Sequence, residues 1–185
     1  MALFDANILL LLLDSTLPAP LERATHKPVA GVEKRIMHLV NTLQGNGIKI
    51  IVPTPALAEV LTRAERAGAD YFTKINRSSA FKIESFEIRA AIELARMTAA
   101  AIKAGDKREG VAASWNEIKF DRQIVAIAKI NKVSTIYSDD ENLKTFAVAQ
   151  GIAVVSVGEL PLPPEDAQGA FAWDVLQGDE EPEEE

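Results

Sequence analysis

Acidic residues stand in this sequence at points where an apolar segment ends or a helix could begin. Asp139 and Asp140 follow "TIYS", residues 135–138, and Asp5 follows "ALF" near the N-terminus. Glu59 lies in "PALAEVL" and Asp121 in "FDRQIVAIAKI". Neighbouring carboxylates repel, and in apolar surroundings this repulsion raises a pKa or requires a cation. A hard divalent cation such as Mg²⁺ or Mn²⁺ prefers oxygen ligands, and once bound it can activate water and stabilise the leaving oxygen of a phosphodiester.

These acids also have ordinary structural explanations. Ser138 and Glu141 fit a capping box at the start of a helix. Glu59 stands four residues before Arg63, the spacing of an exposed helix ion pair, and Asp121 could cap a helix or lie in its first turn. Asp residues at strand ends can simply face solvent. One shared site nevertheless explains the set better than several independent accidents.

The predicted elements position the acids at one edge of a sheet. Strands are predicted over 2–5, 48–52, 81–84, 134–138 and 152–157. Helices are predicted over 29–44, 87–104, 120–131 and 141–150, and a further helix has Thr54 as its N-cap and Pro55 at its first position. The apolar run 8–13 is read as a buried turn and 105–118 as a charged loop. Alternating strands and helices without hairpin signals predict an α/β domain with a mainly parallel sheet between two helical layers. Such sheets bind ligands at the edge where strands end and the following helices begin, which is where Asp5, Glu59, Asp121 and Asp140 fall.

Composition divides the chain into a body and a tail. The net charge is −7, but residues 165–185 hold nine acids and no Lys or Arg, so residues 1–164 carry 20 basic and 18 acidic residues. We predict one domain over 1–158 and an acidic, disordered tail over 159–185. The tail could compete with a polyanionic substrate for the site, although a solubilising role is the simpler interpretation.

The sequence also bears on compartment and membrane contact. There is no cysteine, which excludes disulfides, a thiol nucleophile and cysteine-ligated metal, and which agrees with a cytoplasmic location. The apolar run 8–13 is far shorter than the ~20 residues needed to span a bilayer, and Asp5 and Asn7 precede it instead of basic residues. No contact with a membrane is therefore expected.

The segments "LFDANILL", "PALAEVL", "FDRQIVAIAKI" and "IYSDDENL", in this order, resemble the PIN-domain nucleases, and in particular the small bacterial VapC-like toxins, over roughly residues 2–157. The family's acidic motif positions carry over to Asp5, Glu59, Asp121 and Asp140. Its Thr-x-Asp motif places Ser138 at the hydroxyl position and Asp139 at the variable position, where it is a possible further ligand. The resemblance also implies supporting contacts from Ser138 and from Asn7.

The resemblance implies a metal-dependent endoribonuclease. In such an enzyme the four acids hold Mg²⁺ or Mn²⁺ directly or through water, and activated water attacks the phosphorus without a covalent enzyme intermediate. It further implies an RNA substrate and allows an antitoxin protein and a homodimer as partners. Arg63, Lys119 and Arg122 are candidate phosphate contacts, although for Arg122 an ordinary surface position is the favoured interpretation. Trp115 could stack on a base or pack against the body.

Two other functions compete with this one. A PIN-like domain can be a catalytically inert RNA- or protein-binding module, but the complete acid set argues against loss of catalysis. A phosphotransferase of another doubly wound fold also gathers acids at strand ends. Such proteins need a D-x-D after the first strand or a Lys near the last strands, whereas this sequence has D-A-N and lacks a suitable Lys-Pro signal. The chain also has extra length at 14–28, 105–118 and the tail, which weakens a toxin role specifically.

Overall fold

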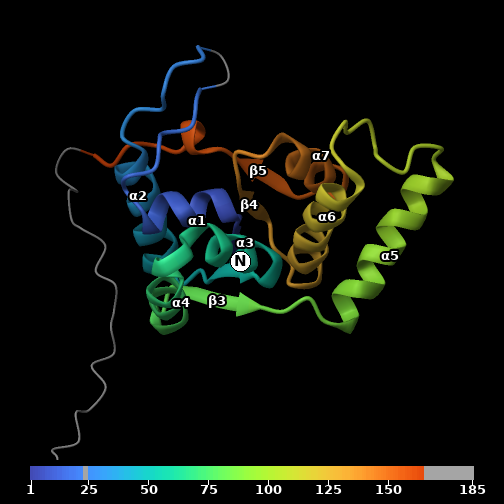
Figure 1. Ribbon diagram of the computed structural model, residues 1–185, viewed down its shortest axis with the longest axis horizontal. Coiled ribbons are helices and arrows are strands. Elements are labelled where there is room, and N and C mark those ends of the chain that lie inside the picture. Colours follow the sequence, from blue (N-terminus) through green and yellow to red (C-terminus); the bar gives the residue numbers. More distant parts are fainter. Residues whose placement is uncertain (23–24, 165–185) are drawn as a thin grey trace, which may run out of the picture.

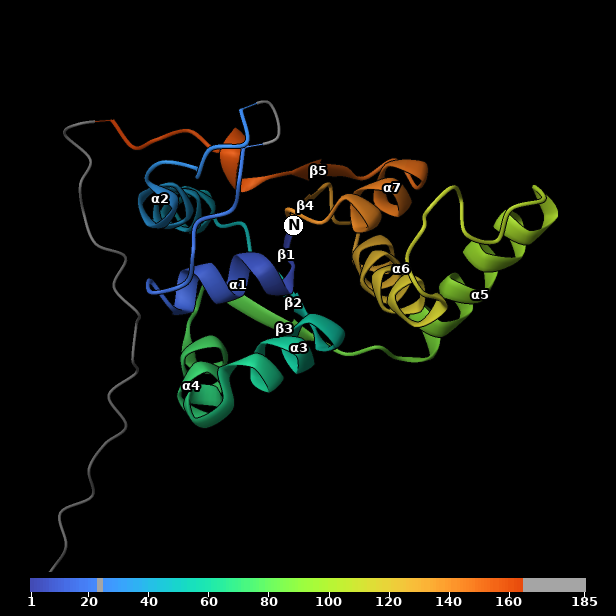
Figure 2. The ribbon, with the colours of Figure 1, turned by 45° about the horizontal axis from the view of Figure 1, so that its top comes forward.

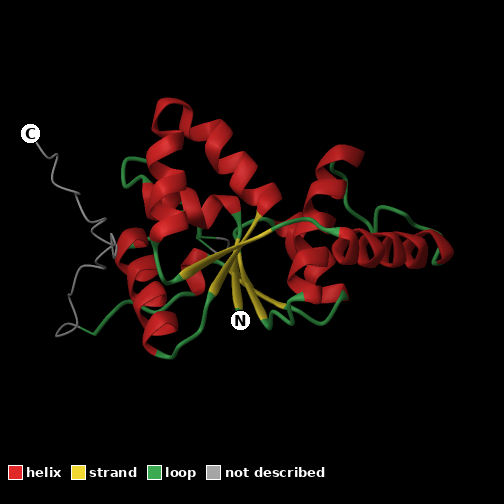
Figure 3. Ribbon diagram, turned by 90° about the horizontal axis from the view of Figure 1, so that it is seen from below, coloured by secondary structure: helices red, strands yellow, loops and turns green. Residues whose placement is uncertain are grey.

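The computed structural model describes residues 1–22 and 25–164. A five-stranded parallel sheet forms its centre, with the strand order β3-β2-β1-β4-β5 (Figures 1 and 3). The strands are β1 (Ala2–Phe4), β2 (Ile50–Pro53), β3 (Phe81–Glu84), β4 (Thr135–Tyr137) and β5 (Ala153–Val155). The helices are α1 (Ala6–Leu13), α2 (Val32–Gly45), α3 (Thr54–Ala64), α4 (Gly68–Arg77), α5 (Ile88–Lys103), α6 (Trp115–Ile130) and α7 (Glu141–Ala149). The predicted α/β class and the parallel sheet are confirmed.

Helices cover both faces of the sheet, as predicted. From β1 the chain moves outward through β2 to β3 and then returns to β4 on the other side of β1. Because parallel crossovers are right-handed, this reversal puts α1 to α4 on one face and α5 to α7 on the other, with α5 outermost beside α6 (Figures 2 and 3). The reversal lies between β1 and β4, and ligands of open parallel sheets bind outside the carboxyl ends of the strands at such a point.

The core follows from strands that are apolar throughout. All residues of β1 and β2 are buried, as expected for central strands covered on both faces. The prediction of a turn for the apolar run 8–13 is wrong. The run belongs to helix α1, and its residues Ile8, Leu9 and Leu10 are buried. Its uniform apolarity hid the helical period, and the sequence signal for this helix is instead Asp5, whose side chain caps it by accepting from the Ala6 backbone N–H.

Helix boundaries differ from prediction at two places that concern the site. Helix α6 begins at Trp115 and not near 120, because Ser114 and Glu117 form a capping box in "SWNE". Asp121 therefore lies in the second turn of α6 rather than at its start. The cap of α3 is Pro53, not Thr54, and the Thr54 hydroxyl accepts from the backbone N–H of Phe86 at 3.1 Å. Helix α4 was not predicted.

The body continues past the predicted boundary at residue 158. Leu160 is buried, and its carbonyl accepts a hydrogen bond from the guanidinium of Arg35 on α2. The predicted disorder of the tail concerns mostly residues 165–185, which lie outside the described residues. Within the described ranges, no helix combines the length and the apolar character that crossing a bilayer requires.

Candidate active site

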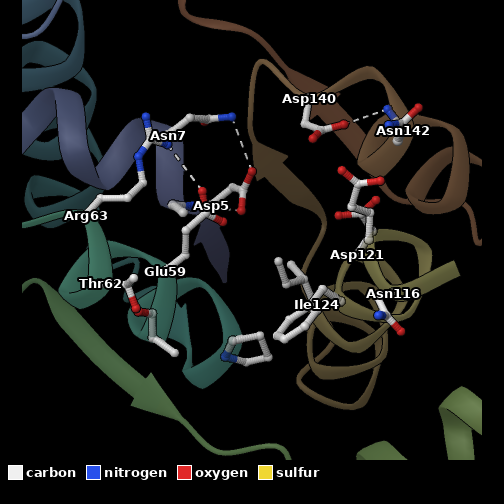
Figure 4. Close-up of a pocket in the computed structure, with 15 residues that line it drawn as sticks. Asp5, Asn7, Glu59, Thr62, Arg63, Asn116, Asp121, Ile124, Asp140 and Asn142 are labelled. Atoms are coloured by element: carbon white, nitrogen blue, oxygen red, sulfur yellow. Dashed lines mark hydrogen bonds and ion pairs between the residues drawn. The ribbon is translucent and has the colours of Figure 1, made fainter. Parts of the chain in front are cut away.

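A cavity of about 640 Å³ opens at the carboxyl edge of the sheet, beside the reversal between β1 and β4. Asp5 reaches it from the end of β1, Glu59 from α3, Asp121 from α6 and Asp140 from the start of α7 (Figure 4). The fold thus brings the four predicted acids to one cavity, although they come from four separate segments. Each is there because a strand ends or a helix passes at this edge.

Asp5 is the most enclosed of the four, with 7 % of its surface exposed. Its carboxylate accepts from the Ala6 backbone N–H at 2.7 Å, from the Ser138 hydroxyl at 2.7 Å and from the Asn7 amide at 3.3 Å. Burial raises the pKa of Asp5 to about 6, and the hydrogen bonds from Ser138 and Ala6 only partly offset this effect. Asn7 and Ser138 therefore contact Asp5 as supporting residues, and they also bond each other at 3.3 Å.

Asp140 both lines the cavity and caps a helix. It is the N-cap of α7, and its Oδ1 accepts from the backbone N–H groups of Asn142 and Leu143 at 2.7 and 3.1 Å (Figure 4). The Ser138–Glu141 capping box is therefore wrong, since Ser138 instead donates to Asp5 and accepts from the Asp140 backbone N–H at 3.0 Å. Ser138 thereby connects the segment after β4 to the end of β1.

Asp121 is half-buried on α6 and faces the other acids across the cavity (Figure 4). Burial is the largest cause that raises its pKa, to about 7, and the negative charges of Asp140, Asp5, Glu117 and Glu59 add to the shift. The cluster thus holds more negative charge than its surroundings compensate.

Glu59 is the most exposed of the four acids. Its carboxylate pairs with Arg63 at 3.3 Å, and both side chains are more than half exposed, at 53 % and 56 %. The simple helix pair anticipated from the sequence is thus present, and at this exposure it contributes only a few tenths of a kcal/mol. The two interpretations of Glu59 are compatible, because a weak surface pair leaves the side chain able to turn toward a bound cation.

The donors around the cavity suit a hard divalent cation. Among the described lining residues five are acids and Arg63 alone is basic, while three asparagines add amide oxygens. As they stand, no three His, Asp or Glu side chains within the described ranges are grouped closely enough to hold a metal ion. Mg²⁺ commonly takes one or two protein carboxylates and keeps several waters, so oxygen donors spread around a cavity fit it. A cation would also stabilise the ionised forms of Asp5 and Asp121, whose pKa values are raised mainly by burial and further by the neighbouring negative charges.

Asp139 does not share this cavity. It lines a smaller one of about 180 Å³ beside α1, and its Oδ1 accepts from the backbone N–H of Val157 at 3.0 Å. The side chain therefore fastens the segment after β4 to the segment after β5. Its predicted role as a further metal ligand does not agree with this placement.

The three candidate phosphate contacts fare differently. Arg63 lines the cavity, whereas Lys119 is exposed on α6, does not line the cavity and has its ammonium over the ring of Trp115. Both predictions for Arg122 are wrong, because the residue is 1 % exposed. It is neither a surface residue nor available to contact RNA. Its guanidinium donates to the Lys107 carbonyl at 2.7 Å and to Glu109 at 2.6 Å. It lies against the rings of Trp115 and Phe146, so Trp115 packs on the body.

Sequence reasoning missed the cavity wall supplied by α6. Asn116, Phe120 and Ile124 line the cavity beside Asp121 and are spaced by four residues, so they share one helix face. The capping signal "SWNE" would have revealed this face, because it extends α6 one turn and a half toward the N-terminus.

Comparison with known proteins supports the fold. No protein-family model and no curated protein matches the sequence. Among solved structures, the chain is similar to a chain of VapBC2 from Rickettsia felis, bound to a DNA fragment from their promoter, with a TM-score of 0.54, 12 % identity and coverage of 84 % of this chain and 97 % of that one. It is also similar to Mycobacterium tuberculosis VapC20, a sarcin-ricin loop cleaving toxin, with a TM-score of 0.51, 15 % identity and coverage of 87 % and 100 %.

The fold is PIN-like. The resemblance that the four acidic segments predicted is confirmed at the level of three-dimensional structure. At identities of 12 % and 15 % these likenesses concern the fold, so activity must be argued from the residues around the PIN-like cavity.

Proposed function

We propose that this protein is a metal-dependent endoribonuclease, which hydrolyses RNA phosphodiester bonds with Mg²⁺ or Mn²⁺ held by Asp5, Glu59, Asp121 and Asp140. The observation that carries the proposal is the meeting of these four acids in one cavity at the reversal point of a PIN-like sheet. Burial raises the pKa of Asp5 and Asp121, and the negative charges of the neighbouring acids add to both shifts. The sarcin-ricin loop cleavage named for the structurally similar VapC20 supports RNA as the substrate class.

The chain's residues would hold and shape this site. A bound divalent ion supplies an activated water and stabilises the leaving oxygen. In the hydrolysis, the water oxygen would bond to the phosphorus as the P–O bond to the neighbouring nucleotide breaks, the released oxygen would end as a hydroxyl group that carries a proton from the water, and no covalent enzyme intermediate is needed. Ser138 and Asn7 keep the Asp5 carboxylate in place, and the cap of α7 fixes Asp140.

We assign substrate attraction to basic residues of α3 and α6, the two helices that face each other across the cavity. Arg63 and Lys119 would contact phosphates without reading sequence. We also propose that the protein is cytoplasmic and is the toxin of a toxin–antitoxin pair, with an antitoxin protein and a second copy of the chain as partners. The VapBC2 structure, a structural neighbour of this chain, supports the antitoxin part of this proposal.

The test is cleavage of a panel of labelled RNAs in Mg²⁺ or Mn²⁺, with the wild type beside Asp121→Asn. This substitution keeps shape but removes the charge that a cation needs. Asp70→Asn is the matched control, since Asp70 is an exposed acid in the first turn of α4 and does not line the cavity. We expect the wild type and the control to cleave, and the Asp121 variant and chelator-treated protein to be inactive.

Other outcomes would change the conclusion. A folded wild type that cuts nothing in the panel would favour the inert RNA- or protein-binding module. Equal cleavage by the wild type and the Asp121 variant would indicate a contaminating nuclease or a different catalytic acid.

A further inference from the structure

The cavity has an apolar half beside its acidic half. Pro55 and Ala58 on α3 face it from one side, and Phe120 and Ile124 on α6 from the other. Figure 4 shows Ile124 beside the acidic residues, on the same helix as Asp121. Hydrolysis of a phosphodiester requires only the carboxylates and their metal ion, so this apolar wall is not explained by the reaction itself.

Phe120 is the distinctive residue of this wall. Its neighbour one turn on, Ile124, is only 5 % exposed, whereas Phe120 is 55 % exposed although it directly precedes Asp121. An aromatic ring that stays half in water forgoes the stabilisation that burial would give. A ring in this position, at the opening of a polar cavity, suits a flat ligand that covers it on binding.

We propose that Phe120, with Pro55, Ala58 and Ile124, forms a subsite for one unpaired nucleobase adjacent to the phosphodiester at the acids. This inference rests on the proposed function and specifies its substrate. Every base has a π-face that stacks on an aromatic side chain, so the contact selects an unstacked nucleotide and not a particular sequence. A base inside an A-form helix cannot offer that face, so the substrate is single-stranded or looped RNA.

The polar residues beside the ring favour a base over an apolar side chain of a partner protein. Asn116 lies one turn before Phe120 on the same face, and Asn142 lines the cavity from α7. An amide offers both a donor and an acceptor, which matches the edge of a base but has no counterpart on an aliphatic group. Arg63 at the rim would meet the adjoining phosphate.

Binding can be measured without cleavage in the Asp121→Asn background with Mg²⁺. The probes are a single-stranded RNA with one 2-aminopurine, moved along successive positions, and the same RNA with an abasic site at each position. We expect Phe120→Ala to weaken binding about tenfold and Phe120→Trp to preserve it. The aminopurine should be quenched at one position only, and quenching should be lost in the Ala variant.

The abasic probes separate stacking from a structural effect. For the protein with Phe120, an abasic site at the quenched position should weaken RNA binding by the same tenfold. With that abasic RNA, Phe120→Ala should weaken binding no further. Phe72→Ala is the matched control, because Phe72 is a 42 % exposed phenylalanine on α4 that does not line the cavity. It should leave binding unchanged.

The subsite would be overturned if the Phe120→Ala variant bound the RNA as tightly as the protein with Phe120. It would also be overturned if an abasic site at every position reduced the affinity equally. Absence of binding to any single-stranded RNA would overturn the subsite as well. If this protein instead bound an apolar peptide in the cavity, the occupant would be a partner protein and not a nucleobase. Metal-dependent cleavage by the wild type that is unchanged in Phe120→Ala would refute the subsite and leave the nuclease standing. Binding with the expected pattern but no cleavage by the wild type would support the subsite and refute the nuclease.

Discussion

Asp121→Asn should change how the stability of the metal-free protein depends on pH. The pKa of Asp121 is about 7 in the folded protein against 3.8 for an ordinary aspartate, so the folded state binds this proton more tightly than the unfolded state. A carboxyl with a raised pKa destabilises the fold as it ionises, and stability is therefore lost as the pH rises from about 4 to about 7. The Asn variant lacks this loss.

The magnitude follows from the pKa difference. Between pH 5 and the folded-state pKa of about 7, ionisation of Asp121 would lower the free energy of unfolding by 1.36 kcal/mol per pH unit, or roughly 2.7 kcal/mol in total, with little further loss up to pH 8. Because Asp121 is only half-buried, solvent screening reduces this, and we expect about 1–2 kcal/mol. The variant should therefore gain that much unfolding free energy, relative to the wild type, when the pH is raised from 5 to 8.

The assay is urea denaturation in chelator at both pH values. Asp70→Asn serves as the control, since an exposed acid outside the cavity should shift stability by at most about 0.5 kcal/mol at either pH. A difference between the wild type and Asp121→Asn that is the same at pH 5 and pH 8 would refute the electrostatic description of the cluster.

Other predictions concern the same residues and their neighbours. Mg²⁺ or Mn²⁺ should raise the melting temperature more at pH 8 than at pH 5.5, because ligand carboxylates must be ionised; an equal rise at both would contradict this. Ser138→Ala should cost about 1–2 kcal/mol in urea and raise the pKa of Asp5 further, which NMR titration would detect. Arg122→Ala should cost about 2–4 kcal/mol of unfolding free energy, because it removes a buried side chain that packs on two rings and leaves the Lys107 carbonyl without its donor. Lys119→Ala should cost at most about 0.5 kcal/mol and weaken RNA binding, which anisotropy measures. A larger loss of stability in the Lys119 variant would contradict the structural role of Arg122.

The meeting of the four acids could be predicted because it depends on patterns of short range. Apolar strands alternating with helices dictate a parallel sheet, and in such a sheet strand ends and helix starts share an edge whatever the strand order. Asp5 and Asp140 each follow a strand directly, so their placement needed no tertiary information. The length of α6 was equally readable from Ser114 and Glu117.

Tertiary structure decided which neighbouring side chains face the site. Asp139 and Asp140 are adjacent in sequence, yet one bonds the backbone after β5 and the other caps α7 within the cavity, because the path of the chain after β4 sends them in different directions.

The same holds on α6. Arg122 is buried because the preceding loop folds back and offers Glu109 and a carbonyl, contacts between residues 13 and 15 apart that helical periodicity does not encode. Phe120, two residues earlier, stays exposed because α3 stands across an open cavity from it instead of packing against it. The sequence by itself determined the acids and the edge of the sheet where they meet, since strand and helix patterns are local. Only the packing of separate segments decided which residues surround them.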